Sequence, residues 1–266
     1  MWRRFVFSVI PALIVAALWC HGTALRATER GAVRIAAAAD LKFALDEIVE
    51  TFHLRHPDIK VQVTYGSSGN FYAQLSNRAP FDIFLSADVD YPRRLIREGL
   101  APANDEFVYG VGRIVIWVPQ SSSIDVEKLG MQSLLSPEVR KIAIANPRHA
   151  PYGRAAEAAM RSMGVYEQVK DRLVLGDTVL QAGQFVESGS ADIGIISRSH
   201  ALAPSLRGKG RFWEVPLDAY PRRVQGGVIL SWAQDRSAAE ALRDFVLGEE
   251  GRAILGRYGF ETTEGW

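Results

Sequence analysis

Two stretches decide the fold of this chain: Ala36-Ala37-Ala38-Ala39-Asp40-Leu41 and Tyr65-Gly66-Ser67-Ser68-Gly69-Asn70. Each follows an apolar or β-branched run that predicts a strand, at Val33–Ala37 and at Ile59–Thr64, and each precedes a helical pattern. Each therefore places small residues and free backbone N–H groups at the start of a helix, where the helix dipole is positive. Two such helix ends that face one cleft would form a site for a small anion.

The rest of the chain continues this alternation of strand and helix. Further strands are predicted at Asp82–Ser86, Ile114–Val118, Ile142–Ala145, Ile193–Ile196 and Val228–Ser231. Helices are predicted at Leu41–Arg55, Tyr72–Asn77, Tyr91–Glu98, Arg154–Met163, Leu180–Glu187, Ala238–Leu247 and Glu250–Tyr258. The alternation predicts an α/β fold with parallel sheets and helices on both faces. Ligands of such sheets bind beyond the carboxyl ends of the strands, in the loops that lead into the helices.

The N-terminus has the pattern of an export signal. Arg3 and Arg4 precede the apolar run Phe5–Trp19, which is short for a membrane span, and the small residues Gly22 and Ala24 follow. We expect residues 1–24 to be a signal peptide, with cleavage after residue 24 or 27, and the protein to be periplasmic. The alternative is an uncleaved N-terminal anchor.

Composition excludes several classes of function for the exported chain. Removal of residues 1–24 leaves 29 basic side chains (31 minus Arg3 and Arg4) against 30 acidic ones, and it removes Cys20, the single cysteine. Near-neutral charge without a basic stripe argues against nucleic acid as a partner. A chain without thiols has no disulfide, cysteine nucleophile or thiolate metal site.

Two more loops repeat the pattern of the opening stretches. Residues 146–153 lead into a helix, so the N–H groups of Tyr152 and Gly153 are expected at its start, and Gly176-Asp177-Thr178-Val179 opens another helix. A single serine, threonine or aspartate before a helix is usually only a cap. The coincidence of four such loops favours a site for an oxyanion.

Motifs for catalysis are not found in the sequence. The stretch Gly66-Ser67-Ser68-Gly69 has the wrong spacing for a nucleophile elbow, and Gly110-Val111-Gly112 lacks the third glycine of a dinucleotide fingerprint. His53 and His56 are three residues apart on a predicted helix, but no third metal ligand is near them, so they are expected on a solvated face. His149 is expected to shape its loop by a hydrogen bond.

Four segments together resemble the periplasmic molybdate-binding proteins of ABC transporters. They are Ala36–Leu41, Tyr65–Asn70 with Ala79–Asp88, Asn146–Gly153 and Gly251–Phe260, and the resemblance runs in register over residues 33–261. It implies two α/β lobes of the type II-like periplasmic binding protein fold, joined by crossing strands at Tyr109–Pro119 and Arg222–Ser231. Lobe one would comprise residues 33–112 plus 226–266, and lobe two residues 113–225. The lobes would close on a tetrahedral oxyanion, molybdate or tungstate, in the cleft between them.

The positions of the family's ligand-binding residues can be carried over one at a time. Ser68 matches the serine of the second loop, and Tyr152 and Val179 match two backbone donors. The serine of the first loop falls on Asp40, beside Ala39, and a tyrosine of better-known members falls on Ser197. The oxyanion-binding residues expected from the resemblance are Ala39, Asp40, Ser67, Ser68, Tyr152, Val179 and Ser197, with no residue that binds a metal cation directly.

Asp40 is unusual beside a dianion. At a separation of about 4 Å and an effective dielectric constant near 20, each pair of like unit charges costs about 4 kcal/mol. We therefore expect the carboxylate to turn back and cap the helix that starts at Leu41, accepting from the N–H of Lys42 or Phe43. Two alternatives remain open: the carboxyl group is protonated, or the ligand is not a dianion.

These observations predict a monomeric periplasmic solute-binding protein that performs no chemistry and needs no cofactor. It would capture the oxyanion with neutral dipoles and deliver it to the membrane permease of an ABC transporter. One alternative is a binding protein for another small anion or an organic solute. A second is an exported enzyme that acts on an anionic substrate.

Overall fold

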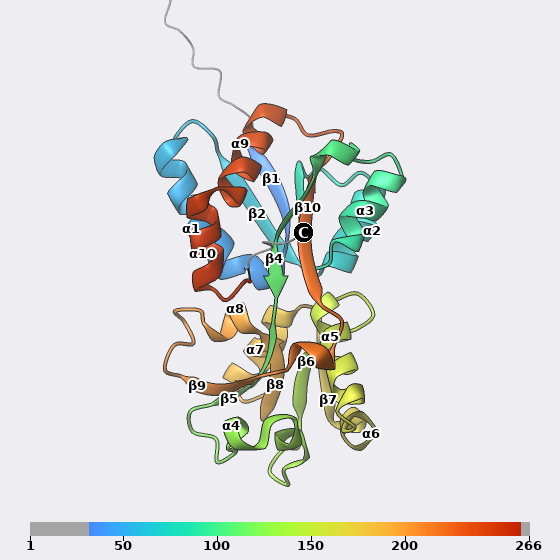
Figure 1. The fold of residues 1–266 in the computed structure, drawn as a ribbon, viewed down its shortest axis with the longest axis vertical. Helices are drawn as coiled ribbons and strands as arrows, with labels where there is room; N and C mark the ends of the chain where they lie inside the picture. Colours follow the sequence, from blue (N-terminus) through green and yellow to red (C-terminus); the bar gives the residue numbers. More distant parts are fainter. Residues whose placement is uncertain (1–31, 262–266) are drawn as a thin grey trace, which may run out of the picture.

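The computed structural model describes residues 32–261, which form two lobes, each built around a five-stranded sheet (Figure 1). The strand order is β2-β1-β3-β10-β4 in the first sheet and β7-β6-β8-β5-β9 in the second. In each sheet the fourth strand runs antiparallel to both neighbours, and the other four point the same way. The predicted α/β fold with two lobes and mostly parallel sheets is confirmed. The expected signal peptide, residues 1–24, lies outside the described residues.

The first lobe has helices on both faces of its sheet. Its strands are β1 (Val33–Ala38), β2 (Val61–Gly66), β3 (Ile83–Ser86), β4 (Glu106–Gly112) and β10 (Arg223–Ile229). Its helices are α1 (Lys42–Arg55), α2 (Ser68–Ser76), α3 (Asp90–Arg97), α9 (Arg236–Leu247) and α10 (Glu249–Arg257). Successive side chains of a strand point to opposite faces, so Ile35 packs with α1, α9 and α10 while Ala36 packs with α2 and α3.

The second lobe repeats this arrangement around one large core. Its strands are β5 (Ile114–Pro119), β6 (Ile142–Ala145), β7 (Leu173–Gly176), β8 (Ile193–Ser197) and β9 (Gly210–Glu214). Its helices are α4 (Val126–Leu129), α5 (Pro151–Ser162), α6 (Tyr166–Val169), α7 (Val179–Glu187) and α8 (Arg198–Ala201). Short 3₁₀ turns complete the described chain at Ala39–Leu41, Ala103–Asp105, Gly130–Leu135, Lys170–Arg172 and Leu217–Ala219.

The chain passes between the lobes twice, and both passages are visible in Figure 1. Only Arg113 separates β4 in the first sheet from β5 in the second, and residues 215–222 join β9 to β10. Each fourth strand enters its sheet from the other lobe, which explains why it runs against its neighbours. β10 pairs with β4 from Arg223 opposite Gly112, with a bulge between Gln225 and Gly226.

The structure differs from the sequence predictions at edge strands and helix starts. The edge strands β7 and β9 are not among the predicted strands, and neither is the start of β4. β7 offers an apolar run of only three residues, Leu173–Leu175, and β9 carries Arg211 and Glu214, so neither stands out as a buried strand. The helices α2 and α5 begin several residues earlier than predicted, at Ser68 and Pro151. Over residues 32–261, no helix is both long and apolar enough to cross a membrane.

Candidate functional site

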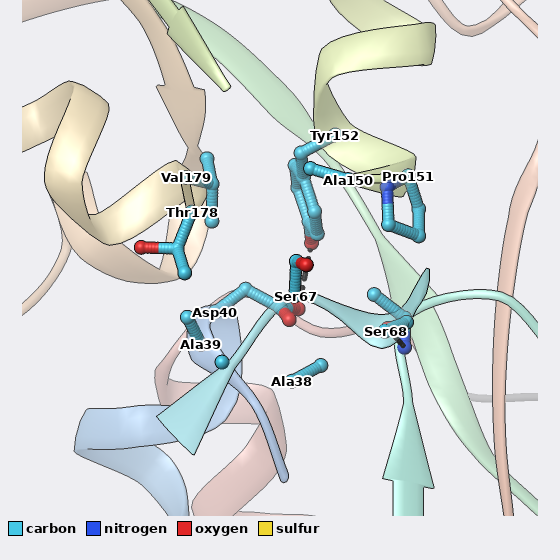
Figure 2. A pocket seen from close by; sticks show the side chains of 12 residues that line it. Ala38, Ala39, Asp40, Ser67, Ser68, Ala150, Pro151, Tyr152, Thr178 and Val179 are labelled. Carbon is cyan, nitrogen blue, oxygen red and sulfur yellow. Dashed lines mark hydrogen bonds between the residues drawn. The ribbon is translucent and has the colours of Figure 1, made fainter. Parts of the chain in front are cut away.

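Four strand-to-helix loops meet at one pocket between the lobes (Figure 2). The pocket is small and leaves about 10 Å³ for the centre of a water-sized sphere. It is lined by Ala38, Ala39, Asp40, Gly66, Ser67, Ser68, Ala87, Ala150, Pro151, Tyr152, Thr178 and Val179. Six of the seven residues expected from the sequence are in this set, and Ser197 is not.

The early helix starts bring backbone donors to the pocket. α2 begins at Ser68 because the Oγ of Ser67 accepts the Asn70 N–H at 3.4 Å, and α7 begins at Val179 because Thr178 accepts the Gln181 N–H at 3.1 Å. α5 begins with Pro151, whose ring presets the helical φ angle and which has no N–H. The caps occupy the N–H groups of Asn70 and Gln181, whereas those of Ser68, Tyr152 and Val179 have no acceptor within their own helices and are available to a ligand.

Ser68 presents a side-chain donor in addition. The residue is fully buried, and its Oγ accepts the backbone N–H of Ala87 at 3.0 Å. This contact uses a lone pair of the hydroxyl oxygen and keeps the hydroxyl hydrogen for an acceptor in the pocket. Ser68 is therefore suited to donate to an anion, as the sequence predicted.

Contacts between the lobes close the pocket. The Gly69 N–H donates to the carbonyl oxygen of His149 at 2.9 Å, and Nδ1 of His149 lies 2.9 Å from Oγ of Ser67. The side chain of His149, expected to shape its own loop, forms its hydrogen bond with Ser67 of the other lobe instead. A Cβ atom at Gly69 would lie 2.5 Å from the His149 carbonyl oxygen, so only glycine permits this approach.

The predicted helix cap by Asp40 is wrong. Asp40 lies inside the 3₁₀ turn that precedes α1, and no side-chain cap bond is made at either start. Its Oδ2 instead accepts from Oη of Tyr152 at 2.8 Å and from Nε2 of Gln225 at 2.7 Å. A capping residue has an extended backbone outside the helix, whereas Asp40 lies within the turn and does not cap it. The side chain therefore turns toward the other lobe and β10.

Burial dominates the electrostatics of Asp40. Its side chain is 3% exposed, and desolvation raises the pKa of the carboxyl group to about 6, although the hydrogen bonds from Gln225 and Tyr152 oppose this rise. Burial also raises the pKa of the Tyr152 hydroxyl well above its ordinary value, so Tyr152 stays a neutral donor. The other carboxyl oxygen, Oδ1, is buried and has no hydrogen-bond partner in residues 32–261.

Ser197 lies one step behind the pocket wall. Its Oγ caps α8 by accepting the His200 N–H at 3.3 Å, and it lies 3.0 Å from the Oγ of Ser199. Ser199 donates to the backbone carbonyl of Asp40 at 2.7 Å. Ser197 therefore supports the first loop from behind.

Sequence reasoning missed Gln225, Gly112 and the side chain of Tyr152. A Cβ at Gly112 would lie 2.2 Å from Oη of Tyr152 and 2.3 Å from Nε2 of Gln225, so this glycine makes room for both donors to Asp40. The one available signal was a polar glutamine inside the crossing strand, between Val224 and two glycines. Arg148, the only cation of the predicted loops, does not line the pocket, whose one charged side chain is that of Asp40.

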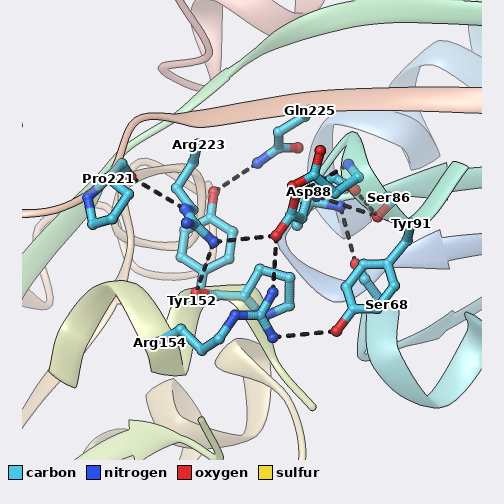
Figure 3. Close-up of polar contacts among 12 residues, drawn as sticks. Ser68, Ser86, Asp88, Tyr91, Tyr152, Arg154, Pro221, Arg223 and Gln225 are labelled. Atoms are coloured by element: carbon cyan, nitrogen blue, oxygen red, sulfur yellow. Dashed lines mark hydrogen bonds and ion pairs between the residues drawn. The ribbon is translucent and has the colours of Figure 1, made fainter. Parts of the chain in front are cut away.

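A charged cluster beside the pocket also joins the lobes (Figure 3). Arg154 on α5 contacts Oδ2 of Asp88 at 2.8 Å and donates to Oη of Tyr91 at 3.2 Å. Arg223 on β10 lies 3.6 Å from the same carboxylate oxygen and is 9% exposed. Burial lowers the pKa of Arg223, and Asp88 opposes that shift. Across residues 32–261, no group of three or more histidine, cysteine or acidic side chains is placed to hold a metal ion.

Two α/β lobes, joined by two crossings and closed over a pocket of helix N-termini, define a solute-binding protein with the periplasmic binding protein fold. The chain belongs to the family of bacterial extracellular solute-binding proteins, which it matches over residues 33–261.

Named relatives narrow this class. The chain is 33% identical to the molybdate-binding protein ModA of Azotobacter vinelandii over 234 residues. This alignment covers 88% of this chain and 91% of that protein. It is 35% identical over 202 residues to ModA of Rhodobacter capsulatus, covering 76% and 77% of the two chains. The solved periplasmic molybdate-binding protein of Azotobacter vinelandii matches the structure with a TM-score of 0.81 at 28% identity, over 87% of this chain and all of the other. These matches confirm the family resemblance that the motifs predicted, and the relatives carry names of binding proteins, not of enzymes.

Proposed function

We propose that this protein captures a small tetrahedral oxyanion, molybdate or tungstate, between its lobes and delivers it to the permease of an ABC transporter. The observation that carries the proposal is the convergence of helix N-termini on one small pocket lined by no lysine or arginine. The names of the relatives supply the choice of molybdate.

The proposed ligand contacts are neutral donors from both lobes. The hydroxyl of Ser68 and the first-turn N–H groups near Ala39, Asp40 and Ser67 would bind from the first lobe, and the N–H groups of Tyr152 and Val179 from the second. A hydrogen bond to a charged group contributes about 1.5–3 kcal/mol, so several of them can replace the hydration of an anion. Ser197 is not retained in this set because it lies behind the wall of the pocket.

Ligand capture would be coupled to lobe movement. Each lobe supplies only part of the donor set, so an anion bound to both favours the closed arrangement, which presents one surface to the permease. Of the lobe boundaries expected at residues 112/113 and 225/226, the first is supported by the end of β4 at Gly112. Because β10 pairs with β4 from Arg223 onward, we propose the second boundary near residues 222/223. The protein would act as a monomer, perform no chemistry and need no cofactor.

The proposed site of action is the periplasm, reached by cleavage of residues 1–24. Mass spectrometry of the protein recovered from its native cell should find an N-terminus at Leu25 or Thr28. Recovery of intact residues 1–24 in a soluble cytoplasmic fraction would contradict export.

A panel of oxyanions tests the function. Molybdate, tungstate, sulfate, phosphate and chromate are each added to the purified protein, and thermal unfolding and heats of binding are measured. A ligand at one hundred times its Kd adds about 2.7 kcal/mol to the free energy of unfolding, so molybdate and tungstate should raise the Tm clearly. Stabilisation by phosphate or an organic solute alone would favour the alternative of a binding protein for another solute. Turnover of an anionic ester would favour the alternative of an exported enzyme.

A further inference from the structure

One oxygen of the pocket has no partner and belongs to its only charged side chain. Asp40 is 3% exposed, its Oδ2 accepts two hydrogen bonds, and its Oδ1 accepts none within the described chain. Figure 2 shows the Asp40 side chain directed toward Tyr152 across the group of pocket residues. A buried polar atom without a partner is costly in a folded protein, so this oxygen requires an explanation.

The groups packed around Asp40 supply donors but no counter-ion. Tyr152 from α5 and Gln225 from β10 donate to its carboxylate, and the negative charge of Asp40 helps to raise the pKa of Tyr109 on β4. Ser199 from α8 contacts only the backbone of Asp40.

The nearby ionisable groups have other partners. Arg154 and Arg223 contact Asp88, Arg113 pairs with Glu214 and Glu261, and His149 contacts Ser67. Burial lowers the pKa of His200 on α8 to about 4, so this side chain is neutral near pH 7.

An ionised Asp40 would repel an oxyanion held in the same small pocket, because no lysine or arginine lines the pocket to offset the two negative charges. A proton on Oδ1 reverses this effect, since the neutral acid becomes a donor to an anion oxygen. The same proton gives the unpartnered oxygen a partner when the pocket is filled.

We propose that Asp40 binds the oxyanion as a neutral carboxylic acid, with the proton on Oδ1, so that capture of a fully deprotonated oxyanion takes up one proton from solvent. The proton returns to solvent when the ligand leaves. This inference rests on the proposed function and adds pH control to the same site.

The raised pKa of Asp40, about 6, indicates the pH range. Above pH 6 the ligand-free carboxyl is ionised, and each unit of pH lowers the protonated fraction tenfold. The Kd for molybdate should therefore rise about tenfold per pH unit, until the pH passes the still higher pKa of Asp40 in the complex.

Calorimetric titration of molybdate and tungstate from pH 6.5 to 8.5 tests the coupling in the wild type, in Asp40→Asn and in the exposed control Asp58→Asn. For the wild type and Asp58→Asn, we expect the Kd to rise by up to about 100-fold, with one proton taken up per anion in buffers of different ionisation enthalpy. Asp40→Asn should bind with a nearly constant Kd and no proton uptake, and tighter than the wild type at pH 8.5.

Each other outcome has a distinct meaning. Binding with the same Kd at every pH in the wild type overturns the coupling and leaves oxyanion binding intact. A slope that persists in Asp40→Asn assigns the proton to another group and also overturns the proposal. No binding by any of the three proteins overturns the proposed function, and the coupling with it.

Discussion

Ser68 and Asp40 are both buried in the pocket wall, and their oxygens are in opposite hydrogen-bonding states. Ser68 accepts a backbone N–H and keeps a hydrogen to donate, whereas Asp40 keeps an acceptor oxygen without a donor. An anion satisfies the first residue directly. An anion can bond to Oδ1 of Asp40 only if that oxygen carries an added proton, so the contributions of the two side chains to binding can be measured separately.

Replacement of Ser68 by alanine should weaken oxyanion binding by one to two decades. The hydroxyl donates a charge-assisted hydrogen bond of about 1.5–3 kcal/mol, and each decade of affinity corresponds to about 1.4 kcal/mol. Calorimetric titration measures the change. Ser133→Ala, at an equally buried serine whose hydroxyl donates to the Gly130 carbonyl, is the control and should leave the affinity unchanged. Equal affinities of Ser68→Ala and wild type would remove Ser68 from the site.

The ligand-free protein should gain stability from Asp40→Asn at pH 8 and much less at pH 4.5. The pKa of Asp40 is raised in the folded state, from 3.8 to about 6. The stability that the carboxyl group contributes is therefore fully present below pH 3.8 and is lost as the pH rises through 6. The loss above pH 6 is on the order of 3 kcal/mol, at about 1.4 kcal/mol per pKa unit. Thermal unfolding at both pH values measures the difference, with Asp58→Asn as the exposed control. A gain of equal size at both pH values would contradict the raised pKa.

At the scale of elements, the first turn of α2 carries both a ligand donor and a lobe contact. Ser68 faces the pocket, while the next residue, Gly69, donates to the segment before α5. The start of α2 therefore controls binding and closure together. This depends on the Ser67 cap, which begins the helix several residues before its apolar pattern becomes visible.

Gly69→Ala should hold the lobes apart. The added Cβ would lie 2.5 Å from the carbonyl oxygen of His149 and 2.9 Å from Oη of Tyr91, and the carbonyl is backbone that cannot rotate away. We expect at least a tenfold loss of oxyanion affinity and a larger radius of gyration than wild type in saturating molybdate, measured by small-angle X-ray scattering. Gly256→Ala, at a helical position with no atom within 4 Å of the new Cβ, should leave both unchanged. Wild-type closure in Gly69→Ala would show that this contact does not limit the lobes.

At the scale of the whole molecule, closure depends on contacts far apart in the sequence. Asp88 in the first lobe contacts Arg154 on α5 of the second lobe and Arg223 at the start of β10, so one carboxylate contacts a helix of the other lobe and a crossing strand together. This cluster lies outside the pocket lining, so it can alter the open–closed equilibrium without touching the ligand.

Arg154→Gln should lower oxyanion affinity three- to tenfold by favouring the open form. The Arg154 side chain is 35% exposed, so its ion pair with Asp88 is partly screened and contributes about 1 kcal/mol. The loss should appear as faster dissociation in stopped-flow measurements and should shrink at high salt. Arg161→Gln on the same helix breaks contacts with Glu157, Glu167 and Tyr166 of its own lobe and serves as the control. Equal losses in both variants would rule out a specific role of the cluster.

Much of the fold could be predicted because its central strands are marked by local patterns. The runs at Val33–Ala38 and Ile142–Ala145 are buried and apolar except for Arg34, and small or capping residues follow them. The half-buried edge strands are marked weakly, since β7 has only three apolar residues and β9 carries two charged ones, and their pairing depends on neighbours distant in the sequence. Six of the seven expected site residues reach one pocket because each lies at the end of a strand or the start of a helix.

The sequence by itself determined the alternation of strands and helices, the capped helix starts and the small residues that leave N–H groups free, since these depend on neighbours a few positions away. Only the tertiary structure decided the state of Asp40. Its two donors, Tyr152 and Gln225, lie 112 and 185 residues away in the chain, and its burial depends on both lobes. Hydrogen bonding and desolvation of a side chain are set by whatever surrounds it in space, so local sequence predicted a cap where the folded chain formed a buried acid.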